Sequence, residues 1–177
     1  MKTEFTLLRT VRCYCLLLLS LLLIGTGTMM GQNPIDIIRL QTNKTLGENF
    51  NVGIETAEGG SFTIEGLNGN DDDGYTVGAQ TIVVKGNIET LTCYKNELVQ
   101  IDLSACHGLK KLDCRGNKLT ALDASPVGAL QWLACNDNEL TTLNVNNLGH
   151  LSELYCHNNK LGSLQVGTYA ALVQLYC

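Results

Sequence analysis

Charged residues are scarce in this sequence, and basic residues are scarcer than acidic ones. Only 16% of its 177 residues are charged while 45% are apolar, which excludes an intrinsically disordered polar chain. Without Lys2, Arg9, Arg12 and Glu4, the 12 basic and 17 acidic residues of the whole chain become 9 and 16, a formal charge of −7. Nucleic acids and anionic membranes are bound by a basic face, so neither is expected as a partner.

Long hydrophobic runs are also missing, except for one near the N-terminus. Three basic residues precede an apolar run from Cys13 to Ile24, and small residues follow it as far as Gly31. The run of about a dozen residues is shorter than the roughly 20 that a membrane-spanning helix needs. Residues 1–31 are therefore predicted to be a secretory signal peptide, cleaved near Gly31 or Gly27. Cys13 and Cys15 would leave with it, and the mature chain would be exported without a transmembrane helix.

The sequence contains an internal repeat with a period of 21 residues. Each unit reads L-x-x-L-x-C-x-x-N-x-L-x-x-L and is separated from the next by a short spacer, without a single insertion. This is the pattern of a leucine-rich repeat that carries cysteine where leucine is commoner. The cysteine column is Cys93, Cys114, Cys135, Cys156 and Cys177, and the asparagine column is Asn96, Asn117, Asn138 and Asn159.

The period predicts a solenoid in which each coil adds one strand to a parallel sheet. Alternation along a strand turns Leu112 and Cys114 inward and their neighbours outward. We expect a curved horseshoe with the sheet on its concave face and a short irregular, 3-10 or extended convex side. About 4.5 repeats fill residues 80–177, and residues 32–79, with short β-branched runs between Gly and Asn clusters, predict a β-rich N-terminal cap. The sequence stops at Cys177 inside a predicted strand, without a closing unit. We expect either a fragment of a longer chain, which we favour, or a partner that covers this end.

The cysteine column predicts a ladder of buried free thiols rather than disulfides or a metal site. Equivalent residues on neighbouring strands lie about 4.8 Å apart with parallel side chains, whereas a disulfide needs Cβ atoms about 3.8 Å apart that face each other. Zinc sites favour two cysteines two to four residues apart, and no such pair of cysteines occurs in residues 32–177. The asparagine column is expected to satisfy backbone groups at the turn that leaves each strand.

The 21-residue unit with its cysteine column resembles the internalin-type leucine-rich repeat proteins of bacteria. The stretches LDCRGNKLTALDAS and LYCHNNKLGSLQV are similar to repeats in surface or secreted proteins of Bacteroidetes. The resemblance covers residues 80–177. It implies a curved solenoid that recognises other proteins in adhesion or host contact, at the bacterial outer surface or after secretion.

The outward side chains of the predicted strands form the candidate ligand-binding face. It holds the single tryptophan and three of the five tyrosines that follow the signal peptide. Aromatic rings beside charged groups are typical of protein-recognition surfaces, although such contacts can also serve only to stabilise a sheet. The predicted face comprises Tyr94, Lys111, Asp113, Arg115, Trp132, Asn136, Glu153, Tyr155, His157 and Tyr176.

Catalysis is not expected from this sequence. No phosphate-binding loop, hydrolase nucleophile motif or zinc-protease motif occurs, and His157 has no nucleophile in register with it. The acidic stretch NGNDDDG is predicted to be a solvated turn, because Gly69 occupies a position where a calcium loop needs a ligand. We therefore predict no catalytic residue, metal or cofactor.

Three functional hypotheses follow. The first is a binding module for a protein or a glycan, the second is a spacer that displays a further C-terminal domain, and the third and weakest is a thiol or metal enzyme.

Overall fold

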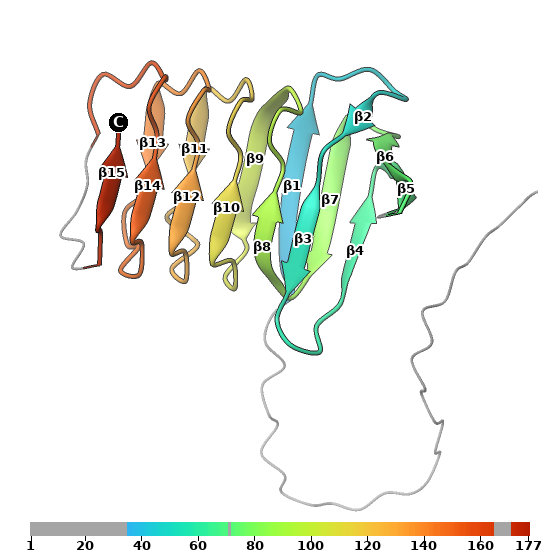
Figure 1. The fold of residues 1–177 in the computed structure, drawn as a ribbon, viewed down its shortest axis with the longest axis horizontal. Coiled ribbons are helices and arrows are strands. Elements are labelled where there is room, and N and C mark those ends of the chain that lie inside the picture. Colours follow the sequence, from blue (N-terminus) through green and yellow to red (C-terminus); the bar gives the residue numbers. More distant parts are fainter. Residues whose placement is uncertain (1–34, 71, 165–170) are drawn as a thin grey trace, which may run out of the picture. The chain divides into compact units, whose positions relative to one another are not determined.

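The computed structural model describes residues 35–70, 72–164 and 171–177 (Figure 1). The predicted signal peptide, with Cys13 and Cys15, lies outside these residues. All regular elements within them are β-strands, so the described part of the chain holds no helix long and apolar enough to cross a membrane.

Each coil contributes one strand to a six-stranded sheet, the front sheet (Figure 1). Five of its strands are parallel and pair in register at steps of 21 residues, so that Leu112 lies between Leu91 and Leu133. The sixth, β3 (Gly53–Thr56), pairs antiparallel with β8. The predicted repeat solenoid is confirmed. The parallel strands are β8 (Ile88–Thr92), β10 (Lys111–Asp113), β12 (Trp132–Ala134), β14 (Glu153–Tyr155) and β15 (Gln174–Tyr176).

The opposite side of the coils consists of extended segments. β9 (Leu98–Ala105) belongs to a four-stranded back sheet, and β11 (Ala121–Asp123) and β13 (Thr142–Asn144) form a parallel pair. These strands are again one repeat apart, since Leu122 pairs with Leu143. Of the three forms expected for this side of the repeat, the described coils therefore adopt the extended one.

Residues from the N-terminal region complete the back sheet in a way that the sequence did not indicate. Its strand order is β4-β7-β1-β9. The bounds are β1 (Asp36–Thr42), β4 (Phe62–Glu65) and β7 (Thr81–Gly86). β1 runs antiparallel between β7 and β9, and its alternating pattern buries Ile38 and Leu40 completely in the core.

A small third sheet joins β2 (Asn49–Phe50), β6 (Gly74–Val77) and β5 (Leu67–Asn70) in that order. The acidic stretch therefore connects the two strands of a hairpin. Its described residues are held by Asn70, whose side-chain oxygen accepts hydrogen bonds from the backbone N–H groups of Asp72 and Asp73 at 2.9 and 3.0 Å. This is the local side-chain bonding of an ordinary turn.

The core is continuous from the N-terminal strands through the coils. In each of the coils from Leu91 to Leu154 the inward leucine of the front strand is fully buried, and residues of the back side close the coil behind it. Burying one such side chain contributes roughly 1.5–3 kcal/mol, and no coil can do so without its neighbours. Stacking therefore supplies the stability that a single coil lacks.

The chain turns out of each front strand through a residue with left-handed backbone geometry. Gly116 has φ 66°, and the equivalent residues of three other coils, Lys95, Asp137 and Asn158, have φ 55°, 56° and 54°. Asn and Asp adopt this left-handed region more readily than most residues, and lysine has no such preference. The turn sets the next residue, the repeated asparagine, inside the coil.

Candidate binding face and its supporting ladders

The cysteine column forms a row of buried free thiols behind the front sheet. Cys93, Cys114, Cys135 and Cys156 are at most 2% exposed. Burial raises the pKa of the Cys156 thiol to about 11 and holds the pKa values of the other three well above the ordinary value of 9.0. Cys114 also donates a weak hydrogen bond to the carbonyl oxygen of Ala134, at 3.4 Å. These thiols are poor nucleophiles near neutral pH.

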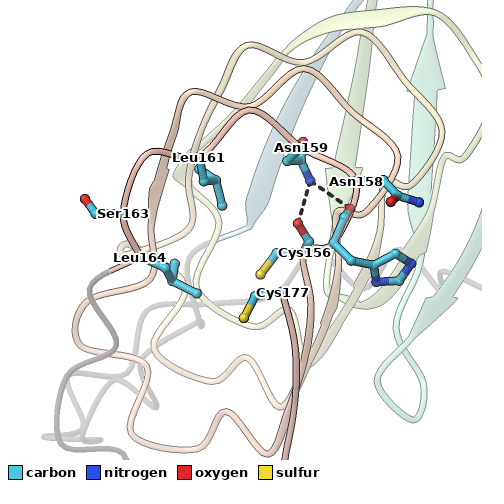
Figure 2. A pocket seen from close by; sticks show the side chains of 8 residues that line it. Cys156, Asn158, Asn159, Leu161, Ser163, Leu164 and Cys177 are labelled. Atoms are coloured by element: carbon cyan, nitrogen blue, oxygen red, sulfur yellow. Dashed lines mark hydrogen bonds between the residues drawn. The ribbon is translucent and has the colours of Figure 1, made fainter.

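Cys177 differs from the rest of the column. It follows β15, the outermost strand of the front sheet, and its side chain is exposed. Figure 2 shows it beside Cys156 at a cavity of about 270 Å³, which Leu161 and Leu164 also line. Within the described residues, no three His, Cys, Asp or Glu side chains are grouped so that they could hold a metal ion.

The asparagine column ties each coil to the one before it. The side-chain oxygen of Asn117 accepts hydrogen bonds from the backbone N–H groups of Asn96 and Leu98, at 2.8 and 3.1 Å. Its amide nitrogen donates to the carbonyl oxygens of Cys93 and Cys114, at 3.1 and 2.9 Å. Asn138 and Asn159, one and two coils further on, repeat the two bonds to carbonyl oxygens and each accept from one backbone N–H, that of Leu119 and of Leu140 respectively. A single buried amide thus satisfies four backbone groups of two coils.

Asn96 belongs to the first coil, which no other repeat precedes, and its side chain forms hydrogen bonds with the N-terminal region instead. Its side-chain oxygen accepts from the backbone N–H of Asn51 at 2.8 Å, and its amide nitrogen donates to the carbonyl oxygen of Asn51 at 2.6 Å. The hydroxyl of Thr42 donates to the carbonyl oxygen of Asn96 at 2.5 Å. Sequence reasoning missed Asn51 and Thr42, because neither belongs to the 21-residue period.

The predicted face residues lie on the outer side of the front sheet and the turn that follows it, but they are unequally accessible. Tyr94, Lys111, Arg115 and Tyr176 are exposed, whereas Trp132, Glu153, Tyr155 and His157 are half-buried. Asp113 and Asn136 are 5% and 9% exposed, so the expectation that they are open to a ligand was wrong.

The burial of Asp113 and Asn136 has a local cause in each case. The Asp113 carboxylate lies 3.3 Å from the guanidinium of Arg115 and accepts a hydrogen bond from its backbone N–H. The amide of Asn136 donates to the carboxylate of Asp137 at 2.6 Å, and Asn158 donates to the other oxygen of that carboxylate at 2.7 Å. The bond from Asn158 is the main cause of the lowered pKa of Asp137. Both Asp113 and Asn136 therefore act within the face rather than on a ligand.

A row of aromatic rings runs across three neighbouring strands of the face. The ring centroids of Trp132 and Tyr155 are 5.6 Å apart with a tilt of 45°, and those of Tyr155 and Tyr176 are 5.0 Å apart and almost parallel. Lys111 places its ammonium group 4.8 Å from the centroid of Trp132, from the strand on the other side. Arg115 lies 5.4 Å from the ring of Tyr94 in the same manner. Each contact contributes about 0.5–1.5 kcal/mol and fixes the ring's orientation.

Polar groups complete this row. The hydroxyl of Tyr155 donates to the carboxylate of Glu153 at 2.8 Å, which raises the pKa of Tyr155, and it lies 2.9 Å from the side-chain oxygen of Gln174. His157, two residues after Tyr155, lines the same cavity as Cys156, Ser163 and Cys177. The row can contact a partner by apolar area, hydrogen bonds and charge.

Ion pairs between neighbouring coils lie along the turns, away from the face. Lys118 pairs with Glu97 at 2.7 Å and Lys160 with Glu139 at 2.6 Å, each across 21 residues. Glu and Lys alternate at one position of the repeat, so these ion pairs could have been predicted from the sequence. Exposed pairs of this kind contribute little stability but favour the correct register of coils.

Comparison with known proteins yields a partial match. No protein-family model matches the chain, and no curated protein does. Among solved structures, the functional domain of InlJ from Listeria monocytogenes, described as including a cysteine ladder, is 38% identical over 45% of this chain. The TM-score is 0.44, and the match spans 18% of that structure's chain. The repeats are similar to those of a cysteine-ladder internalin. The 21-residue, cysteine-containing repeat from which the resemblance was inferred is present in the structure as a stack of coils with a column of buried thiols.

Proposed function

We propose that this protein is a non-enzymatic binding module that recognises another protein through the outer face of its front sheet. The observation that carries the proposal is the ordered row of Trp132, Tyr155 and Tyr176 flanked by Lys111 and Arg115. Large rings and guanidinium groups that are already held in place lose little entropy on binding, which is why they dominate protein-recognition surfaces. In the horseshoe expected from the sequence, this face is the concave one.

A protein partner is favoured over a glycan by the state of the aromatic faces. Sugar recognition of the stacking kind needs an open ring face, but Trp132 is contacted by Lys111 and Tyr155 from opposite strands. Tyr155 is contacted by Trp132 and by Tyr176. Trp132 and Tyr155 therefore have little free ring face and present mainly their edges, which suit the backbone and side chains of a polypeptide.

Export to the cell surface or the medium completes the proposal. It is supported by the basic and apolar pattern of residues 1–31, which is typical of a secretory signal peptide. The N-terminal strands would close one end of the array. The backbone N–H and carbonyl groups of Asn51 bond to the side chain of Asn96, and in the later coils the preceding coil supplies such groups. A thiol enzyme is disfavoured by the burial of Cys93, Cys114, Cys135 and Cys156.

The test is to pan a phage-displayed library of random 12-residue peptides on the immobilised protein and then on the Trp132→Ala/Tyr155→Ala variant. Peptides retained by the unaltered protein should lose at least tenfold in affinity on this variant, because its apolar anchors are gone. Gln41→Ala/Thr81→Ala on the outer side of the back sheet is the matched control and should bind normally. Tyr155→Phe keeps the ring and serves as the conservative variant. Circular dichroism checks that each variant is folded. Equal binding by all variants would refute the proposed face.

A further inference from the structure

Lys111 is a cation without an anionic partner in the middle of the proposed face. Among the described residues, six other lysines and arginines form ion pairs, Lys44 donates to the carbonyl oxygen of Asn49, and Lys95, in the turn after β8, is the remaining one. Lys111 contacts the ring of Trp132, and no carboxylate of a described residue lies within 4.0 Å of its ammonium group. Its neighbour Lys110, by contrast, is paired with Glu89 at 2.5 Å.

Glu153 is the converse case on the same face. Its carboxylate accepts a hydrogen bond from the hydroxyl of Tyr155 at 2.8 Å, and within the described coils it forms no ion pair with a lysine or arginine. The hydrogen bond orients the carboxylate but leaves its negative charge uncompensated. The face thus carries one open positive and one open negative charge.

The register of the front sheet relates these two charges geometrically. Lys111 pairs with Trp132, and Trp132 pairs with Glu153, so the three residues form one row across β10, β12 and β14. Neighbouring strands lie about 4.8 Å apart, which places the Cα atoms of Lys111 and Glu153 roughly 10 Å apart with Trp132 between them. An extended polypeptide advances about 3.3 Å per residue and turns every second side chain to the same face, so three successive side chains on that face span about 13 Å, which the long side chains of Lys111 and Glu153 can reach.

Covering the face would remove water from both charges. A buried charge without a counter-charge is strongly unfavourable, and contact with an aromatic ring compensates a lysine only in part. A partner that covers Trp132 must therefore place an anionic group beside Lys111 and a cationic group beside Glu153. A partner without these groups must leave both side chains hydrated, and it binds weakly.

We propose that the partner of this face is an extended polypeptide segment with an acidic residue and a basic residue four positions apart and an apolar residue midway between them. The acidic residue lies on Lys111, the basic residue lies on Glu153, and an apolar residue between them contacts Trp132. This inference rests on the proposed function and specifies the chemistry of its ligand. The pattern is local, so it does not require a partner of opposite net charge.

The library of random 12-residue peptides also tests this pattern. Peptides whose binding depends on Trp132 and Tyr155 are expected to carry an acidic and a basic residue four positions apart, with an apolar residue midway between them. Exchanging the two open charges, in the Lys111→Glu/Glu153→Lys variant, should weaken these peptides at least tenfold. It should restore the binding of synthetic peptides in which the acidic and basic residues have been exchanged.

Lys95→Glu is the matched control, because Lys95 is another exposed lysine without an ion pair and lies outside the row. It changes the net charge as Lys111→Glu does, and it should leave affinity within twofold. Peptides that need Trp132 and Tyr155 but show no such charge pair, or that bind equally after the charge exchange, would overturn this inference and leave the proposed function standing. Finding no peptide that depends on the two aromatic residues would overturn the proposed function itself.

Discussion

Asn117 shows how much of the solenoid depends on single side chains. Its amide satisfies two N–H groups and two carbonyl groups that belong to two coils, all of them buried. Another residue of similar size would leave several of these groups without partners, since the turn has no ladder to replace the amide. The repeated asparagine is therefore a structural residue.

Replacement of Asn117 by alanine should lower the free energy of unfolding by roughly 2–4 kcal/mol, because buried donors and acceptors are left unsatisfied. Asn159→Ala is the control, since Asn159 accepts from one backbone N–H instead of two and is only partly buried, and it should cost about half as much. Urea denaturation followed by circular dichroism measures both. Equal and small losses would show that water replaces the amide in either coil.

The thiol ladder predicts a loss of stability in alkali. Burial raises the pKa of Cys93, Cys114 and Cys135 above the ordinary value of 9.0, so the folded state keeps protons that the unfolded state releases. The stabilisation is complete below about pH 9 and declines as the pH rises further, by up to about 1.4 kcal/mol per pH unit for each thiol. Cys114→Ala should decline less steeply than the unaltered protein between pH 9 and 11. Urea denaturation over this range measures the slopes, and identical slopes would contradict the assignment.

At the scale of elements, β1 has the largest effect on the fold. It lies between β7 and β9 and pairs with both, so the N-terminal region and the first coil share one back sheet. Asp36, at its start, accepts hydrogen bonds from the backbone N–H groups of His107 and Gly108 at 2.6 and 3.2 Å. Through these contacts β1 joins the beginning of the array to residues about 70 positions later.

Substitutions on the two sides of β1 should therefore have very different effects. Leu40→Asp places a carboxylate at a fully buried position and is expected to cost more than about 4 kcal/mol, or to prevent folding of the array. Gln41→Asp, one residue along on the exposed side, should cost less than about 0.5 kcal/mol. Thermal denaturation compares the two variants. A protein that keeps a cooperative transition with Leu40→Asp would show that the coils fold independently of β1.

At the scale of the whole molecule, stacking creates the candidate face. Trp132, Tyr155 and Tyr176 come from three coils, and no coil alone holds two of these rings. The face therefore exists only when the coils are in register, which the asparagine ladder and the ion pairs between coils enforce. Any partner that bridges several strands should also stabilise the folded protein in proportion to its binding.

The sequence by itself determined the length of each coil, the inward columns of leucine, cysteine and asparagine, and the row of outward residues. A strict period carries this information because each residue's neighbours lie one coil away, at the same repeat position. Tertiary structure alone decided the position of β1 in the back sheet, the hydrogen bonds between Asn96 and Asn51, and the burial of Asp113 and Asn136. These depend on contacts between dissimilar residues, some of them far apart in the chain, and on how side chains lean over one another, which a repeating pattern does not encode.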